Sequence, residues 1–514
     1  MTLHFGTAGL RGPVGDGPDA MNVETVTRAT AGLADWLRRR HAAGGAVVVG
    51  RDARHGSEDF FAATTQTFAA AGFDVVALPA PGPTPLVAFA TRRLGAVAGV
   101  MITASHNPPR DNGYKVYLDG GAQLIEPADR EIEACIAAAP PAADIPRVPV
   151  EPDARARAVR DDYLARLDAR FGAPETTPLR IALTPLHGVG GALAVEALRR
   201  SGFGDVHVVA AQAEPDPDFP TVAFPNPEEP GATDLLLSLA ADRRADLAIA
   251  LDPDADRCAV GVPGRDGEWR MLTGDETGAL LTAAILDERQ AAGRHGRAPV
   301  VASSIVSGTL AGAIAEARGA RSVRTLTGFK WLVRAGEPLV YAYEEALGHC
   351  VDPDAVRDKD GISAAVALAR LAAARTRTGS DLVAALEELM TAYGRRVTAQ
   401  RSLRVERQAD LAALMAGLRR DPPAALAGVP VVVADLAAGG PGPHTDAVEL
   451  AGRDRSGITV RIVARPSGTE PKLKYYGEAA VPPGDQRPAE ALAGLLSAVL
   501  AGLPGGTLSE RGTP

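Results

Sequence analysis

The chain has 514 residues and a mass of 53.0 kDa, enough for about three to four domains of ordinary size. Apolar residues make up 46% and charged residues 23%, as in soluble globular proteins, and no apolar run approaches the roughly 18 residues of a membrane helix. The net charge of −9 disfavours a nucleic-acid binder, because such proteins usually carry a basic face. The N-terminus does not resemble a signal peptide, and three cysteines without a CxxC pair argue against a disulfide framework or a zinc finger. We therefore expect a cytoplasmic protein with no nucleic-acid or membrane partner.

One pattern recurs along the chain. A short apolar run ends in a loop of Gly, Ser, Asp or Pro, and an alanine-rich helical stretch follows. Strands that alternate with helices indicate α/β layers, in which ligands bind at the carboxyl ends of the strands. The pattern is found at residues 46–54, 99–109, 179–191, 245–257, 300–308 and 339–349, with a further helix predicted over 409–419 and a strand over 458–464.

Three aspartates stand at alternate positions directly after one predicted strand, in the segment DPDADR (252–257), which we call the metal loop. A turn in this loop brings Asp252, Asp254 and Asp256 toward one hard cation, and such oxygen ligands suit Mg²⁺. The loop lacks the downstream Gly and Glu of an EF-hand. Acidic turns are also common as plain solvated surface, but an apolar strand that leads directly into three carboxylates and Arg257 favours a metal site.

The segment TASHNPPRDNGYK (103–115), here the nucleophile loop, follows another predicted strand. Ser105 lies at the junction of strand and loop, and His106 and Lys115 are close in sequence, which suits an exposed nucleophile with a base in reach. The segment is not the GxSxG elbow of hydrolases. Taken alone, a turn of Ser and Asn also serves as an ordinary cap.

Two further segments carry candidate binding residues. The phosphate loop, ARPSGTEPKLKYY (464–476), gathers backbone N–H groups, hydroxyls and cations in one tight turn, although it is not a Walker A sequence. The sugar loop, YEEALGH (343–349), offers Glu344 and Glu345 to sugar hydroxyls, and His349 as a group that moves a proton near neutral pH, although a lone histidine is more often structural. The phosphate-binding candidates are Arg465, Ser467, Gly468, Thr469 and Lys472.

Lysine is scarce. Of 54 basic residues five are lysines, so that 49 are arginines (54 − 5). Since positive charge alone is supplied by arginine in this chain, a retained lysine indicates a need for a compact ammonium or for a tunable proton affinity, with chance survival as the alternative. The five are Lys115, Lys330, Lys359, Lys472 and Lys474.

In this order, and across nearly the whole chain, the four loops resemble the motifs of the α-D-phosphohexomutase superfamily, the phosphoglucomutases and phosphomannomutases. FGTAGLRG near the N-terminus agrees with the same family, and DNGYKVY, LTPLHGVGG, TLTGFKWL and DKDGISAAV are most similar to the branch of type-two phosphoglucomutases and phosphopentomutases. The resemblance implies an α/β fold of four domains around a central cleft, three similar mixed-sheet domains and a smaller α+β domain. The implied domains are 1–152 with the nucleophile loop, 153–268 with the metal loop, 269–392 with the sugar loop and 393–514 with the phosphate loop.

The resemblance also implies a role for each candidate residue. Ser105 would be a phosphoserine, and the three aspartates would hold Mg²⁺ together with its phosphate. Arg11 and Arg257 would stabilise charge near the transferring phosphoryl group, and Lys115 and His349 are two candidates for acid/base catalysis. The residues left for substrate binding are His106, Lys330, Glu344, Glu345, Arg465, Ser467, Gly468, Thr469 and Lys472.

The implied enzyme is an isomerase that moves a phosphoryl group between the 1- and 6-positions, or the 1- and 5-positions, of small sugar phosphates through a sugar bisphosphate, as a monomer or dimer. Phosphoglucomutase or phosphomannomutase is favoured, and phosphopentomutase is the alternative, because many hexomutases have Ser where this chain has Leu347 and so gain a hydroxyl contact to the sugar. A Mg²⁺-dependent sugar phosphatase would not need a phosphoserine or a second phosphate loop. A non-catalytic sugar-phosphate-binding protein would not need to retain Ser105 and the aspartates.

Overall fold

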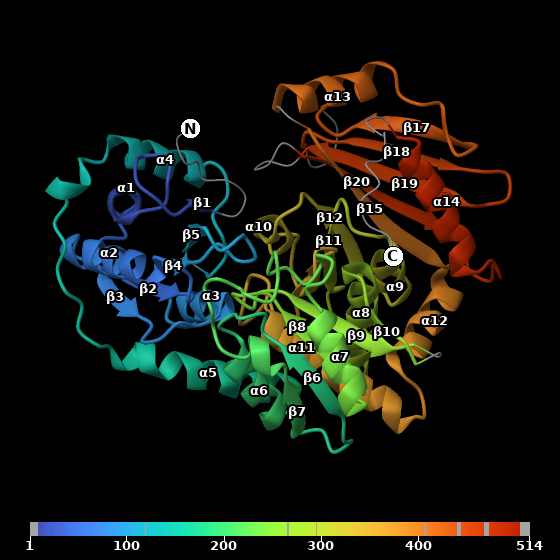
Figure 1. Cartoon of the computed structure of the whole chain (residues 1–514), viewed down its shortest axis with the longest axis horizontal. Coiled ribbons are helices and arrows are strands. Elements are labelled where there is room, and N and C mark those ends of the chain that lie inside the picture. Colours follow the sequence, from blue (N-terminus) through green and yellow to red (C-terminus); the bar gives the residue numbers. More distant parts are fainter. Residues whose placement is uncertain are drawn as a thin grey trace.

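The computed structural model describes residues 9–118, 120–264, 267–294, 296–405, 408–438, 444–466 and 472–503. In these residues the chain forms four sheets, which follow one another along the sequence from blue to red in Figure 1. Each of the six predicted strand-to-loop segments contains a strand, which confirms the α/β prediction. No helix in the described ranges is long and apolar enough to cross a membrane.

The first sheet is covered by helices on both faces. Its elements are β1 (Leu10–Pro13), α1 (Val23–Arg39), β2 (Ala46–Arg51), α2 (Ser57–Ala70), β3 (Asp74–Ala77), α3 (Thr84–Arg93), β4 (Ala98–Ile102), β5 (Asp111–Leu118), α4 (Ala128–Ala138) and a 3-10 turn, η1 (Ala142–Asp144). The strand order is β1-β5-β4-β2-β3, with β2 parallel to β3 and β4 and with β5 antiparallel to both of its neighbours. Val47 and Val49 pack under α1 and α2, whereas Val48 packs under α3, because side chains alternate along a strand.

The second sheet has the order β10-β9-β8-β6-β7. Its elements are α5 (Ala154–Phe171), β6 (Arg180–Thr184), α6 (Gly191–Arg200), β7 (Asp205–Val208), the 3-10 turn η2 (Ala210–Gln212), α7 (Asp234–Arg243), β8 (Leu247–Leu251), β9 (Cys258–Pro263) and β10 (Trp269–Met271). β6 runs parallel to β7 and β8, and β9 runs antiparallel to β8. The predicted start of the third domain, residue 269, falls on β10, which pairs with β9 of this sheet.

The third sheet has the order β12-β11-β13-β14, with β11 parallel to β12 and β13. Its elements are α8 (Gly274–Ala291), β11 (Val300–Ser304), α9 (Leu310–Ala317), β12 (Arg321–Thr325), α10 (Phe329–Leu332), β13 (Leu339–Glu344), β14 (Gly348–Cys350), α11 (Gly361–Arg377) and α12 (Leu382–Tyr393). α11 packs on α6 and on strands β8 and β9 of the second sheet. One apolar cluster therefore runs from Val48 of the first sheet through Ile249 of the second to Tyr341 of the third.

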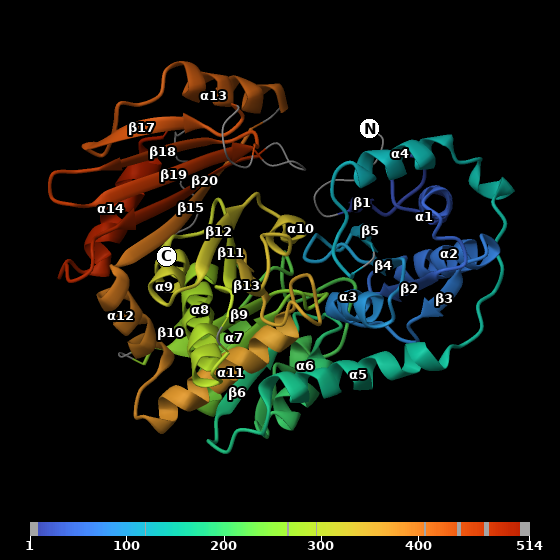
Figure 2. The ribbon, with the colours of Figure 1, turned by 180° about the vertical axis from the view of Figure 1, so that it is seen from behind.

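The fourth sheet is antiparallel and has a core of its own. Its elements are β15 (Arg396–Arg404), α13 (Gln408–Arg420), β16 (Ala425–Leu426), β17 (Val429–Asp435), β18 (Val448–Arg453), β19 (Thr459–Pro466), β20 (Lys472–Ala480) and α14 (Ala489–Ala501), in the strand order β15-β20-β19-β18-β17-β16. α13 and α14 pack with one face of the sheet. The other face of β19 and β20 carries Arg461, Lys474 and Glu478, and β15 lies next to α9 of the third sheet (Figures 1 and 2).

His349, a predicted acid/base catalyst, lies in the core of the third sheet. Its side chain is buried, with Nδ1 at 2.8 Å from the Tyr341 hydroxyl and Nε2 at 3.3 Å from Thr277 Oγ1. The ring stacks with Tyr341 and Tyr343. Burial lowers the pKa of His349 to about 3, so the ring is neutral and both of its nitrogens are occupied by neighbours in the core. This environment favours a packing role for His349 over proton transfer.

The buried histidine should make stability pH-dependent. Its pKa is depressed in the folded state and close to 6.5 in the unfolded chain, so its contribution is present above pH 6.5 and is lost as the pH falls toward 3. We expect this group alone to lower the free energy of unfolding by about 2 kcal/mol between pH 7 and pH 5. Urea unfolding of the wild type and of His349→Phe at both pH values measures the difference. Equal pH dependence in the two proteins would contradict the assignment.

Candidate active site

Three of the loops that follow buried parallel strands meet at one place. Ser105 follows β4, Asp252 follows β8 and Glu345 follows β13, at the strand ends where open α/β sheets bind ligands. The nucleophile loop is joined to the metal loop, because Ser105 Oγ donates to Asp252 Oδ2 at 3.0 Å. The metal loop is joined to the sugar loop, because Arg257 Nη1 donates to the carbonyl oxygen of Ala346 at 3.0 Å. The structure therefore brings these three predicted loops together.

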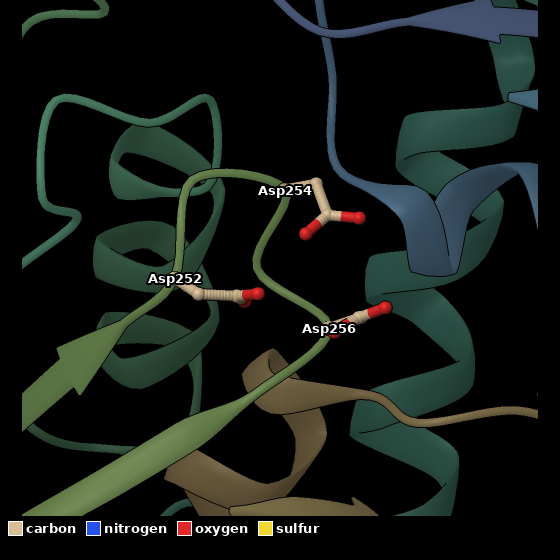
Figure 3. Close-up of side chains that lie close together, drawn as sticks. All are labelled: Asp252, Asp254 and Asp256. Carbon is tan, nitrogen blue, oxygen red and sulfur yellow. The ribbon is translucent and has the colours of Figure 1, made fainter. Parts of the chain in front are cut away.

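The three aspartates form a group that fits a metal ion. Figure 3 shows their side chains on the turn that follows β8. Each offers a carboxylate oxygen within 4.8 Å of the other two, and all three residues are buried. Among the described residues, Asp254 Oδ1 and Asp256 Oδ1 find no hydrogen-bond donor. Unpaired buried oxygens are costly, and a cation that prefers oxygen ligands would satisfy both.

The aspartates shift one another's protonation. Burial raises the pKa of Asp252 well above its usual value, and the nearby charges of Asp254 and Asp256 raise it further. Burial also acts to raise the pKa of Asp254, but Lys115 and a hydrogen bond from Thr84 outweigh it and hold the pKa below its usual value. The Thr84 hydroxyl lies 2.5 Å from Asp254 Oδ2. The group is therefore stable only with cations and donors packed around it.

Cations from three domains surround the carboxylates. Lys115 Nζ, from β5 of the first sheet, lies 2.6 Å from Asp254 Oδ2 and 2.9 Å from Asp256 Oδ2. Lys359 Nζ, which precedes α11 of the third domain, lies 3.3 Å from Asp256 Oδ2. Arg257 Nε, from the metal loop itself, lies 3.9 Å from Asp256 Oδ1. Positive charge from the first and third domains thus reaches a carboxylate group of the second.

The predicted proton carrier Lys115 is an ammonium in this arrangement. Its side chain is only 3% exposed, and burial by itself lowers the pKa of a lysine. The two carboxylates outweigh burial and raise the pKa of Lys115 above its usual value. A compact ammonium with rotatable donors fits between two carboxylates where a planar guanidinium would not, which gives a physical reason for lysine at this position.

Ser105 lies at a strained turn with its hydroxyl in reach of two partners. Its φ of 54° is in the left-handed region, and its Oγ lies 3.2 Å from Nδ1 of His106 as well as 3.0 Å from Asp252. Burial lowers the pKa of His106 well below its usual value, and the charges of Arg257 and Arg11 lower it further. The ring next to the serine is therefore neutral near pH 7.

Arg11 and Arg54 hold the nucleophile loop in shape. Arg11 Nη1 donates to Asn107 Oδ1 at 3.2 Å. Burial lowers the pKa of Arg11, and the aspartates of the metal loop, which raise it, only partly offset this effect. Arg54 Nη2 donates to the backbone oxygens of Ser105 at 2.6 Å and Asn107 at 2.7 Å, and its Nη1 donates to that of Pro108. Arg54 thus holds the loop by its backbone, and Arg11 holds it by the Asn107 side chain.

The two glutamates of the sugar loop are held differently. Glu344 Oε1 accepts from the backbone N–H of Gly328 at 2.6 Å, and burial, followed by the charge of Glu345, raises the pKa of Glu344. Glu345 Oε2 accepts from the hydroxyls of Ser304 and Ser307, each at 2.8 Å. Both serine bonds go to the same oxygen of Glu345.

Leu347 has a packing role that its sequence position did not predict. Its φ is 63°, and its side chain is 3% exposed within the apolar cluster of Val209 and Leu236, in the second domain. Its carbonyl oxygen accepts from the N–H of Cys258, at the start of β9, at 3.1 Å. Leu347 therefore anchors the sugar loop to the domain of the metal loop.

The remaining predicted residues lie on the third and fourth domains. Lys330 is buried in α10. Burial lowers its pKa, and the carboxylates of Asp129 and Glu126 in the first domain, which raise it, only partly offset this effect. Arg465 on β19 pairs in register with Lys474 on β20, the strand that begins at Lys472. The predicted phosphate-binding residues outside the described ranges are Ser467, Gly468 and Thr469.

The sequence did not predict a site role for three residues that lie around the aspartates or hold the nucleophile loop. Lys359 could have been found, because lysine is scarce and its segment, RDKDG, is polar. Arg54 follows a predicted strand, as ligand-binding residues do, but an arginine is ordinary in this arginine-rich chain. Thr84 carries no signal in the sequence, because its position beside Asp254 depends on how the first and second domains pack.

Comparison with known proteins agrees with this arrangement. Family models described as phosphoglucomutase/phosphomannomutase, alpha/beta/alpha domains I, II and III, match residues 2–142, 161–265 and 273–393. A probable phosphomannomutase of Haemophilus influenzae is 39% identical over 476 residues, which cover 89% of this chain and 93% of that protein. A probable phosphoribomutase of Schizosaccharomyces pombe is 37% identical over 518 residues, covering 92% of this chain and 86% of that protein.

Solved structures have the same architecture. A crystal structure of a putative phosphomannomutase from Thermus thermophilus superposes with a TM-score of 0.74 at 25% identity, over 97% of this chain and 98% of that chain. The family models together span more than half of the sequence, and the relatives are matched over most of their length. The chain belongs to the phosphoglucomutase/phosphomannomutase family.

Proposed function

We propose that this phosphosugar mutase carries a phosphoryl group on Ser105 and exchanges it with a hexose monophosphate, so that phosphate moves between the 1- and 6-positions through a sugar bisphosphate. The observation that carries the proposal is the 3.0 Å contact of Ser105 Oγ with Asp252 Oδ2. It sets a hydroxyl against a group of buried carboxylates with two unpaired oxygens, which a hydrolase with a serine nucleophile would not need.

Asp252, Asp254 and Asp256 would hold Mg²⁺, because three carboxylates form the oxygen-rich donor set that this ion prefers. A bound Mg²⁺ supplies concentrated positive charge to the phosphate oxygens. Arg257 and Arg11 add positive charge on the side of the nucleophile loop, where Arg11 contacts Asn107. Charge neutralisation of this kind accounts for most catalysis of phosphoryl transfer.

In the transfer step, the bond from phosphorus to Ser105 Oγ breaks as a bond from phosphorus to a sugar hydroxyl oxygen forms. Ser105 Oγ gains a proton and the sugar hydroxyl loses one. Lys115 is the candidate for both movements, because its ammonium can donate to the leaving oxygen and the amine that remains can take the hydroxyl proton. His349 is too buried and too weakly basic for this role. The return step repeats the exchange with the other phosphate of the bisphosphate.

The bisphosphate must be held in two orientations. Glu345 would accept sugar hydroxyls through Oε1, because Ser304 and Ser307 both bond to Oε2. Arg465 and Lys472 would bind the phosphate that does not react. Ser467, Gly468 and Thr469 are proposed to complete the phosphate loop. His106, Lys330 and Glu344 are proposed to contact the substrate from the nucleophile loop, α10 and the sugar loop.

A pentose phosphate is a second candidate substrate, with transfer between the 1- and 5-positions. Two observations favour it. Leu347 carries no hydroxyl, and its side chain packs in an apolar cluster of the second domain. One relative matched over 92% of this chain is named a probable phosphoribomutase. Both candidates use the same nucleophile and metal loop, and they differ in what the sugar loop must recognise.

The nucleophile is tested by removing its oxygen. We expect Ser105→Ala to lose turnover and to keep its melting temperature, because a loop serine supplies chemistry and little packing. Wild-type protein should also carry an added mass of about 80 Da, one phosphoryl group, which the variant lacks. The assay is a panel of glucose, mannose and ribose 1-phosphates with Mg²⁺ and a trace of bisphosphate. Wild-type turnover by the variant would remove Ser105 from the mechanism.

The metal is tested by removal and by a matched variant. Chelation should abolish turnover and Mg²⁺ should restore it. We expect Asp254→Asn to raise the Mg²⁺ concentration for half-maximal activity by about tenfold or more, because one carboxylate fewer weakens the binding of a hard cation. Asp218→Asn, on an exposed loop, serves as the control. Full activity in excess chelator would exclude a metal requirement.

The proton carrier is tested by exchanging one cation for another. Lys115→Arg keeps the charge but neither fits between two carboxylates nor releases a proton near pH 7, so we expect turnover to fall by about a hundredfold or more. Lys472→Arg is the matched control at a proposed phosphate-binding position, where an increase in the Michaelis constant is expected instead. Near-normal turnover by Lys115→Arg from pH 6 to 9 would restrict Lys115 to binding.

A further inference from the structure

We propose that Glu478, on β20 of the fourth sheet, is a positioning residue for Glu345. Glu478 fixes the loop of residues 304–309, called the coupling loop here, and the coupling loop in turn fixes the carboxylate of Glu345. The inference rests on the proposed function, in which Glu345 meets the sugar.

One end of the coupling loop holds the Glu345 side chain. Ser304 and Ser307 each donate to Glu345 Oε2 at 2.8 Å, and the two serine hydroxyls lie 2.9 Å apart. The N–H of Glu345 also points to Ser307 Oγ at 3.3 Å. No hydrogen bond to Oε1 is found among the described residues, so this oxygen is the one left for a sugar hydroxyl.

The other end of the coupling loop is held by the fourth domain. Glu478 Oε2 accepts from the Thr309 N–H at 2.6 Å, and Glu478 Oε1 accepts from the Thr309 hydroxyl at 2.7 Å. Arg396 Nε, on β15, donates to the same hydroxyl at 2.8 Å. Glu478 is buried, so its carboxylate would lose free energy if it lost these donors. The contact therefore resists displacement of Thr309.

The middle of the coupling loop also packs on the fourth domain. Ile305 and Val306 join Ala447 and Val463 in a small apolar cluster between the third and fourth domains. Arg461, on β19, donates to the carbonyl oxygen of Ile305. The third domain holds the loop as well, because Arg324 on β12 donates to the carbonyl oxygens of Ile305 at 2.6 Å and Ser307 at 3.0 Å. The coupling loop therefore lies between the two domains and is bonded to both.

The two ends of the coupling loop are close together along the chain. Only Gly308 lies between Ser307 and Thr309, and its N–H donates to Asp275 Oδ1 at 2.7 Å. The backbone of Glu345 also packs against α8, because a Cβ on Gly274 would come within 1.9 Å of its carbonyl oxygen. A shift of Thr309 would thus reach Glu345 through the serines, both at its carboxylate and at its N–H, which lies 3.3 Å from Ser307 Oγ.

This arrangement links two binding events. The fourth domain carries the proposed phosphate-binding residues, and its docking also orients the carboxylate that reads the sugar. A phosphate that stabilises the docked fourth domain would therefore favour the correct position of Glu345, which is a coupling free energy between two parts of one substrate site.

A double-mutant cycle tests the proposal. Glu478→Gln should raise the Michaelis constant of the best sugar phosphate by about fivefold to tenfold, with kcat changed by less than about twofold. In a Glu345→Gln background, the same change at Glu478 should have no further effect, because the carboxylate that it positions is gone. An equal increase in both backgrounds would show that Glu478 acts on the substrate without Glu345, and would overturn the proposal.

Three variants act as controls. Thr309→Val removes the shared hydroxyl and should reproduce Glu478→Gln, which also keeps the test valid if Glu478→Gln does not fold. Thr309→Ser retains the hydroxyl and should behave as wild type. Glu288→Gln removes a carboxylate that binds Arg170, about 20 Å along α8 from Asp275, and should leave the Michaelis constant unchanged.

Hydrogen exchange separates failure of this inference from failure of the proposed function. If the wild type converts none of the sugar phosphates, the proposed function is wrong. The link between Glu478 and Glu345 is then tested by amide exchange alone, which does not depend on turnover. Glu478→Gln should then speed amide exchange both in residues 304–309 and in the sugar loop (343–349). Faster exchange confined to β20 and Thr309 would overturn the coupling.

Discussion

The burial of three carboxylates, each with an oxygen within 4.8 Å of the other two, is the constraint on which the rest of the site depends. Moving one charge out of water is costly, and three neighbouring charges of one sign are far more costly, unless cations or donors are placed around them. Lys115 lies between Asp254 and Asp256, and Lys359 lies beside Asp256. These ammonium groups, with backbone and hydroxyl donors, offset the unfavourable free energy of burying the carboxylates. The two oxygens still unpaired define where a metal fits.

Because the compensating groups come from different domains, the same electrostatic requirement fixes how the domains pack. Lys115 and Thr84 belong to the first domain, and Lys359 belongs to the third. The carboxylates belong to the second. Separation of these domains would leave buried acids without partners, and one apolar cluster runs through all three of them. The fourth domain, with its own core, is joined through the coupling loop and a small apolar cluster.

Much of this could be read from the sequence, because the signals are local. An apolar strand that ends in Asp252 or Ser105 predicts a strand with a functional loop, and the structure has both. His349 could not be read in this way, since a histidine next to two glutamates looks catalytic until its tyrosine neighbours are known. Leu347 was interpreted only as a lost sugar contact, and its packing against the second domain has no signal in the sequence. Long-range packing decides such cases, and the sugar, the compartment and the oligomeric state stay predictions.

The scarcity of lysine has a consequence for the surface of the enzyme. Three of the five lysines, Lys115, Lys330 and Lys359, are buried, and the two others, Lys472 and Lys474, are partly exposed on β20. Positive charge on the surface is therefore almost entirely guanidinium, which acylating reagents do not modify. Side-chain amines open to such reagents are confined to one strand beside the phosphate loop. Covalent labelling of lysine side chains on the folded enzyme would thus report on β20 alone, next to the proposed phosphate-binding residues.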